Sequence, residues 1–217
     1  MTVHVRTLGA GKQRIVEAVR AGGLDGMLLC SPEHVYYTTG LPAVQGSGNP
    51  ILFALRNQLP YFVYVGADGT MTLLCWIGAT MGFSFDVDEV RSFFSTSSAL
   101  DELRDFLKAT LRPGGKVGIE SSCPWNVVTL MQKVAPSTEL SEIDELMLGL
   151  RMVKTTEELE CIRRATTIVE ATVTDLRASV RPGISRVWLI GEAKRLMLAH
   201  GASGIGHTTI AFGSSNA

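Results

Sequence analysis

The sequence predicts an α/β fold with a layered sheet over most of its length. Short apolar runs typical of buried strands alternate there with amphipathic segments that begin at helix-capping residues. Such alternation is typical of a sheet that is covered by helices. The chain has 217 residues, of which 46% are hydrophobic and 19% charged, so it is long enough and apolar enough to bury a sizeable core.

The first elements follow from apolar spacing and from capping residues. Apolar side chains at helical spacing predict a helix over residues 11–21. Residues 26–30 (GMLLC) are typical of a short buried strand, and Ser31 followed by Pro32 predicts the start of a second helix. Residues 42–50 are rich in Gly, Pro, Ser and Asn and predict a loop. Strands are then predicted at residues 51–55, 61–65 and 71–76, the last two forming a hairpin.

The same alternation continues to residue 134. Residues 86–94 (DVDEVRSFF) predict an edge strand. Ser98 and Asp101 have the spacing of a capping box and predict the start of a helix, which the Arg-Pro-Gly sequence at residues 112–114 ends. A strand at residues 116–119 and a helix at residues 124–134 follow.

A second capping box marks the predicted domain junction. Thr155 with Glu158 opens a long helix whose apolar residues recur with a period near 3.6. We place the boundary near residues 138–151, which divides the chain into a domain over residues 1–145 and a second segment over residues 150–217. In that segment we expect helices at residues 156–180 and 186–200, the second capped by Ser185, and a strand at residues 208–212.

Composition argues against several classes of partner. The formal net charge of -1 leaves no basic excess for nucleic acid or for an anionic membrane surface. No apolar run reaches the roughly 18–20 residues that span a bilayer, and the N-terminus lacks a signal-peptide pattern. Four cysteines are far apart in sequence and form no CxxC pair, which favours reduced thiols and a cytoplasmic location: Cys30, Cys75, Cys123 and Cys161.

Several motifs, taken in order, resemble the creatinase/prolidase/aminopeptidase P family. Residues 150–160 (LRMVKTTEELE) are similar to the junction between the two domains of that family. Residues 31–40 (SPEHVYYTTG) are similar to an early helix of its N-terminal domain, with His34 where the family usually has Asn. Further matches are residues 25–29 (DGMLL), 116–120 (KVGIE), 181–183 (RPG) and 210–217 (IAFGSSNA).

The resemblance implies both a fold and a chemistry. Residues 1–145 would form a creatinase-like N-terminal domain with a mixed sheet flanked by helices. The remainder would hold the first helices and strand of a truncated α+β pita-bread domain. Complete family members are typically dimers whose pita-bread domain binds a pair of divalent metal ions, and many cleave the bond before proline. We therefore expect the complete parent to be a homodimer that uses manganese, cobalt or zinc on a proline-containing peptide or another small substrate.

The chain itself lacks the side chains that this chemistry requires. No Asp or Glu follows Glu192, and His4, His34, His200 and His207 form no HExxH or equivalent spacing. We assign the chain no catalytic residue, no metal ligand and no cofactor, and we expect it to be inactive alone. It is interpreted as the N-terminal portion of a metal-dependent hydrolase resembling Xaa-Pro dipeptidase or aminopeptidase P. Two alternatives are a non-catalytic dimerisation or interaction module and a metal-free creatinase-like amidinohydrolase.

Three residues are candidates for substrate binding. Both His34 and Tyr37 follow the predicted helix start at Ser31; His34 could form a wall of the substrate pocket, and Tyr37 could line the cleft between the domains. His207 begins the strand that borders the active centre in the family that the chain resembles. Each has a structural alternative, because a lone histidine often packs on a helix and a tyrosine often fills a core.

Overall fold

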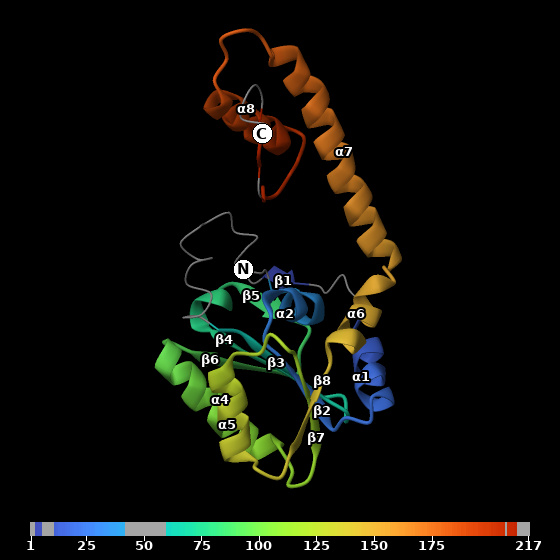
Figure 1. The fold of residues 1–217 in the computed structure, drawn as a ribbon, viewed down its shortest axis with the longest axis vertical. Coiled ribbons are helices and arrows are strands. Elements are labelled where there is room, and N and C mark those ends of the chain that lie inside the picture. Colours follow the sequence, from blue (N-terminus) through green and yellow to red (C-terminus); the bar gives the residue numbers. More distant parts are fainter. Residues whose placement is uncertain (1–2, 6–10, 42–59, 207, 212–217) are drawn as a thin grey trace.

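The computed structural model describes residues 3–5, 11–41, 60–206 and 208–211. In these residues the centre of the fold is a six-stranded mixed sheet (Figure 1). Its strands, in the order β6-β4-β3-β2-β7-β8, are β2 (Gly26–Leu29), β3 (Phe62–Gly66), β4 (Met71–Trp76), β6 (Glu89–Phe93), β7 (Lys116–Ile119) and β8 (Glu139–Glu142). A separate short sheet pairs β1 (Val3–Val5) with β5 (Phe83–Phe85) in parallel.

In the central sheet, as far as the structure describes it, β3 runs antiparallel to both of its neighbours, and the other neighbouring strands pair in parallel. β2 pairs antiparallel with β3, which forms the predicted hairpin with β4. On its other side β2 pairs in parallel with β7, which in turn pairs in parallel with β8. The predicted edge strand is confirmed as β6, parallel to β4. The carboxyl ends of β2, β7 and β8 therefore lie at the same edge of the sheet.

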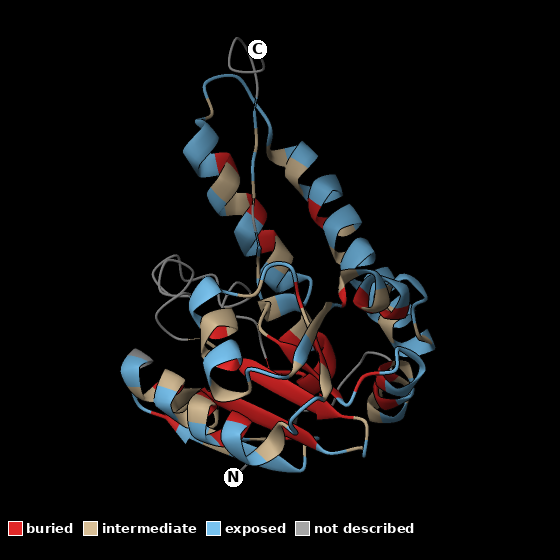
Figure 2. Ribbon diagram, turned by 60° about the horizontal axis from the view of Figure 1, so that its bottom comes forward, coloured by how far each residue is buried: buried red, intermediate tan, exposed pale blue. Residues whose placement is uncertain are grey.

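Helices cover both faces of the central sheet, as the sequence predicted (Figure 1). On one face lie α1 (Gly11–Ala21), α2 (Pro32–Thr39) and α6 (Asp144–Met152). On the other lie α4 (Thr96–Thr110) and α5 (Trp125–Val134). Buried residues concentrate in the sheet and on the helix sides that face it (Figure 2).

The strand β2 illustrates why the fold has three layers. Met27, Leu28 and Leu29 are completely buried. Successive strand side chains point to opposite faces, so Met27 and Leu29 belong to the core under α1 and α2, whereas Leu28 belongs to the core under α4 and α5. A strand that is apolar on both faces is stable only when helices cover both of them.

Two helices extend away from the sheet. α7 (Thr156–Ser179) begins at the predicted Thr155/Glu158 capping box, and α8 (Arg186–Ala199) begins at the predicted cap Ser185. The two helices pack on each other, and His200 Nε2 lies 2.9 Å from Asp175 Oδ2 across their contact. The apolar stripe that the sequence predicted for this helix is largely exposed: Leu159, Ile162, Val169 and Val173 of α7, and Val180 at its C-cap, are 39–59% accessible.

The start of α4 corrects one prediction. The sequence placed the cap at Ser98, whereas the helix begins at Thr96 and Ser95 is the cap. Ser98 forms the reciprocal half of the capping box, because its hydroxyl accepts a hydrogen bond of 2.9 Å from the backbone N–H of Ser95. The predicted helix start was therefore three residues late.

A second correction concerns the strand predicted at residues 208–212. Residues 208–211 are not in a strand, and phenylalanine 212 lies outside the described residues. A strand requires the backbone hydrogen bonds of a neighbour, and none of the sheets formed by the described residues pairs with this segment. The loop and strand predicted at residues 42–55 also lie outside the described residues.

Structure also forms where the sequence predicted only a domain boundary. Residues 138–151 contain β8 and most of α6. Met147 and Leu150 of α6 are buried in the core under α1 and α2. The division at residues 145 and 150 stays a prediction, and α6, which spans it, packs with the N-terminal layers. Within the described residues, no helix is both long and apolar enough to cross a membrane.

Candidate functional site

Polar side chains gather at the edge of the sheet where β2 and β7 end. Cys30 and Ser31 follow β2 directly and lead into α2, while Glu120 follows β7. Because β2 and β7 are parallel neighbours, with Leu28 opposite Ile119, these residues come together from positions about 90 apart in sequence. The crevice at the carboxyl ends of parallel strands is where α/β folds commonly bind ligands.

Glu120 is the centre of this cluster. Its side chain is 1% accessible, and its carboxylate accepts hydrogen bonds from the backbone N–H of Cys30, from the backbone and hydroxyl of Ser31, and from the His34 ring. Burial alone would raise the pKa of Glu120, but the hydrogen bonds from His34, Cys30 and Ser31 outweigh it and hold the pKa below its ordinary value. Glu120 is therefore ionised and fixes the start of α2.

His34 links Glu120 to α6. Its Nδ1 contacts the Glu120 carboxylate, and its Nε2 lies 3.1 Å from Nη1 of Arg151. A guanidinium can only donate hydrogen bonds, so Nε2 must be the acceptor and the proton lies on Nδ1. The ring therefore bridges a buried carboxylate and an arginine. His34 is well positioned to orient Arg151, and both of its ring nitrogens already have partners in the protein.

Tyr37 makes a second link between α2 and α6. Its hydroxyl donates a hydrogen bond of 2.9 Å to the backbone carbonyl oxygen of Leu150. The last carbonyls of a helix have no partner within that helix, and α6 ends at Met152. We call the pairs His34–Arg151 and Tyr37–Leu150 the α2–α6 contact.

Lys154 completes the end of α6. Its Nζ donates to the backbone carbonyl oxygens of Arg151 and Met152, at 2.5 and 3.3 Å. A cation at a helix C-terminus satisfies free carbonyls and complements the helix dipole. The capping box of α7 begins at the next residue, Thr155. The segment that the sequence predicted to be an interdomain junction is thus held at both ends by side-chain hydrogen bonds.

The structure brings together two of the three predicted site residues. His34 and Tyr37 lie on α2 and both reach α6, whereas His207 lies outside the described residues. Their role in substrate binding stays a prediction. Sequence reasoning did not single out Glu120 or Arg151. The available signals were a charged residue directly after an apolar strand and a basic residue in the last turn of a helix.

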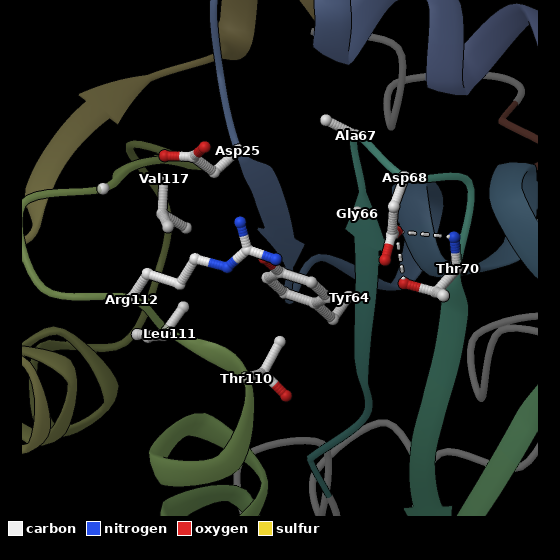
Figure 3. A pocket seen from close by; sticks show the side chains of 11 residues that line it. Asp25, Tyr64, Gly66, Ala67, Asp68, Thr70, Thr110, Leu111, Arg112 and Val117 are labelled. Atoms are coloured by element: carbon white, nitrogen blue, oxygen red, sulfur yellow. Dashed lines mark hydrogen bonds between the residues drawn. The ribbon is translucent and has the colours of Figure 1, made fainter.

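A shallow cavity of about 140 Å³ lies at the opposite edge of the sheet. Figure 3 shows Arg112 and the Tyr64 ring between Asp25 and Asp68. The Asp25 carboxylate accepts a hydrogen bond of 2.7 Å from the backbone of Lys116. Burial raises the pKa of Tyr64 to about 12, with smaller contributions from the two nearby carboxylates. The hydrogen bonds from Thr70 lower the pKa of Asp68.

Among the described residues, neither edge of the sheet has the grouped ligands of a metal centre. In the part of the chain that the structure describes, no three His, Cys, Asp or Glu side chains are grouped so that they could hold a metal ion. A pair of metal ions bridged by carboxylates therefore does not fit these residues.

Comparison with known proteins defines the class. Residues 12–153 match the family model of the creatinase/prolidase N-terminal domain, and the chain belongs to this family. It is 21% identical over 190 residues to the Xaa-Pro dipeptidase of Pyrococcus furiosus and 22% identical to that of Pyrococcus horikoshii. Each alignment covers 88% of this chain and 48% of the relative, so the chain spans about half the length of these curated relatives.

Solved structures support the fold. The prolidase of Pyrococcus horikoshii superimposes with a TM-score of 0.65 at 20% identity, covering 89% of this chain and 49% of that protein. The X-Pro aminopeptidase of Thermotoga maritima superimposes with a TM-score of 0.69 at 16% identity, covering 89% and 50%. These likenesses establish a prolidase-like mixed α/β fold for the chain.

Proposed function

We propose that this chain is the N-terminal portion of a metal-dependent hydrolase resembling Xaa-Pro dipeptidase. The observation that carries the proposal is the family match over residues 12–153 combined with alignments that continue through the junction to cover 88% of the chain. The parent would act on a proline-containing dipeptide with a pair of divalent ions, manganese, cobalt or zinc. The ligands of those ions would lie outside the described residues, which hold no suitable group.

The chain's own residues supply a positioning function in this proposal. α7 starts only a few residues after α6, and α6 is bound to α2 through Arg151 and Leu150. Lys154 and the Thr155/Glu158 capping box fix the intervening turn. The N-terminal domain would thereby set the direction in which α7 leaves the sheet, and so the place of the catalytic residues relative to the N-terminal domain.

The exposed side of α7 supports a second proposal, that the chain self-associates. Four large apolar residues of this helix and Val180 at its C-cap are exposed, and fully burying an exposed side chain of this kind contributes about 1.5–3 kcal/mol. Patches of this kind mark association surfaces. A homodimer, or the remaining part of a longer parent, would cover them. A chain that acts only as a dimerisation module would share this surface without any hydrolysis.

Activity assays separate these proposals. The chain and a longer protein that carries it would each be incubated with Ala-Pro and, as a matched control, Ala-Ala, in the presence of manganese, cobalt or zinc. We expect the longer protein to hydrolyse Ala-Pro and to bind metal stoichiometrically, and the chain alone to do neither. Hydrolysis of Ala-Pro by the chain alone would contradict the proposal that the catalytic residues lie outside this chain. If the longer protein neither bound metal nor hydrolysed Ala-Pro, the hydrolase proposal would be wrong. That result would favour the interaction module.

A further inference from the structure

Two cysteines that are far apart in sequence meet at the edge of the sheet where β2 and β7 end. The Sγ atoms of Cys30 and Cys123 lie 3.5 Å apart, and both residues are partly buried. Cys30 follows β2, and Cys123 lies in the turn between β7 and α5. The parallel pairing of β2 with β7 is what brings them together. A disulfide has an S–S length near 2.05 Å, so closing this pair needs a movement of roughly 1.5 Å.

The backbone around the two thiols is held by the same residue, Glu120. The N–H of Cys30 donates to the Glu120 side chain, and the N–H of Cys123 donates to the Glu120 backbone carbonyl at 3.0 Å. Both cysteines are therefore fixed relative to one residue. A pair held in this way has a high effective concentration for intramolecular reaction.

The two thiols differ in their chemistry. The hydrogen bond with Cys30 lowers the pKa of Cys123, against burial and the nearby Glu120. The same hydrogen bond, together with burial, raises the pKa of Cys30. Since the thiolate is the nucleophile, Cys123 would react first and Cys30 second. Cys75, by contrast, is buried in β4 and its pKa is raised to about 12, while Cys161 is exposed on α7.

We propose that Cys30 and Cys123 form a reversible redox pair that a peroxide converts to a disulfide. In the first step the Cys123 sulfur attacks one oxygen of hydrogen peroxide, the O–O bond breaks, and sulfenic acid and one water form. In the second step the Cys30 sulfur attacks the Cys123 sulfur, the S–O bond breaks, and a second water leaves with the thiol proton. The sum is two thiols and one peroxide giving one disulfide and two waters. A dithiol reductant reverses it.

Oxidation would stiffen the edge that carries the α2–α6 contact. The new bond would tie the residue before the α2 cap to the turn that follows Glu120, and Glu120 binds His34. It would close a loop of about 90 residues, and constraining so long a loop stabilises the folded state. We expect the oxidised chain to melt about 5–15 °C higher than the reduced chain.

Peptide mapping of the peroxide-treated chain tests the proposal. The reduced protein would be exposed to a small excess of hydrogen peroxide, quenched, alkylated in denaturant and digested without reductant. We expect a peptide pair linked through Cys30 and Cys123, two free thiols remaining of the four, and full recovery of four thiols after dithiothreitol. Cys30→Ser should instead accumulate sulfenic acid at Cys123, which dimedone labels. Cys161→Ser, the matched control, should form the linked peptide at the wild-type rate.

Specific outcomes would overturn this assignment. One is that Cys30 and Cys123 stay reduced at peroxide concentrations that already oxidise Cys161. Another is that the linked peptides contain Cys161 from two chains and never the Cys30–Cys123 pair. A third is that dimedone labels Cys30 in the Cys123→Ser variant as fast as it labels Cys123 in the Cys30→Ser variant, which would contradict the proposed order of attack.

Discussion

The hydroxyl of Tyr37 donates a hydrogen bond to the backbone carbonyl of Leu150, a residue 113 positions further along the chain. This bond joins an early helix of the N-terminal domain to the last turn of α6, which leads into α7. One turn earlier on α2, His34 binds Arg151, the next residue of α6. The α2–α6 contact thus connects the buried Glu120 to the predicted interdomain junction.

Removing the Tyr37 hydroxyl should weaken this connection. In Tyr37→Phe the Leu150 carbonyl loses its partner while the ring still fills the core, so we expect a loss of about 1–2 kcal/mol in the free energy of unfolding. Tyr36→Phe is the matched control, because Tyr36 is on the same helix and 44% exposed. Urea denaturation of both variants measures the difference. Equal stability of the two variants would show that the Tyr37 bond contributes nothing.

Glu120 should make stability dependent on pH below about 4.5. Its pKa is lower in the folded chain than its ordinary value of 4.5, so in this range the unfolded chain binds a proton that the folded chain does not. The stabilisation is complete above the unfolded pKa and is lost as pH falls through the folded pKa. Glu120→Gln should be less stable by about 2–4 kcal/mol at pH 7 and should lose less stability on acidification.

Denaturation curves from pH 7 to pH 3 test the role of Glu120. The wild type and Glu120→Gln should approach each other in stability at the acid end. Glu160→Gln, at an exposed position of α7, is the control and should follow the wild type throughout. If the free energy of unfolding of Glu120→Gln fell as steeply with decreasing pH as that of the wild type, other carboxylates would account for the acid sensitivity.

Two adjacent residues of α6 should respond very differently to truncation. Met147 is completely buried among residues of α1 and the sheet, whereas Leu148 is 52% exposed. Met147→Ala should cost about 2–5 kcal/mol because it leaves a cavity, and Leu148→Ala should change stability by less than about 0.5 kcal/mol. Thermal unfolding of the two variants is the measurement. A small effect of Met147→Ala would mean that α6 does not belong to the N-terminal core.

A side chain at position 26 should destabilise the folded chain while Tyr64 is present. A Cβ on Gly26 would lie 2.1 Å from the Tyr64 hydroxyl oxygen and 2.4 Å from its ring, so Gly26→Ala should cost about 1–3 kcal/mol. Gly149→Ala in α6 meets no atom within 4 Å and should stabilise by about 0.5–1 kcal/mol. Combining Gly26→Ala with Tyr64→Val should cost less than the sum of the single changes. If the free-energy costs of the two single changes were strictly additive, the contact between position 26 and Tyr64 would be contradicted.

The sequence predicted those features that depend on neighbours in the chain. The Thr155/Glu158 capping box, the Ser31 and Ser185 caps, and the hairpin of β3 with β4 are encoded within a few residues, and all are confirmed. β8 was not predicted because it is a polar edge strand, ELSE, without an apolar pattern. The start of α4 was misplaced because Ser95 and Ser98 both have the chemistry of a cap.

The candidate site depends on contacts that local patterns do not encode. His34 was singled out, but its partners Glu120 and Arg151 are 86 and 117 residues away. Cys30 and Cys123 were interpreted as distant thiols, and the register of β2 on β7 places them in contact. Such neighbours depend on the order of the strands in the sheet. Local patterns in the sequence do not reveal that order.

Hydrogen exchange of the α6 backbone tests the central claim most directly. Exchange of amides 147–152 would be compared in the wild type, in the double variant Tyr37→Phe/Arg151→Ala, and in the control Tyr36→Phe/Arg104→Ala, which alters exposed residues outside the contact. If the α2–α6 contact holds the junction, the double variant should exchange at least about tenfold faster in α6 while α4 and the control stay unchanged. Wild-type protection of α6 in the double variant would contradict the account.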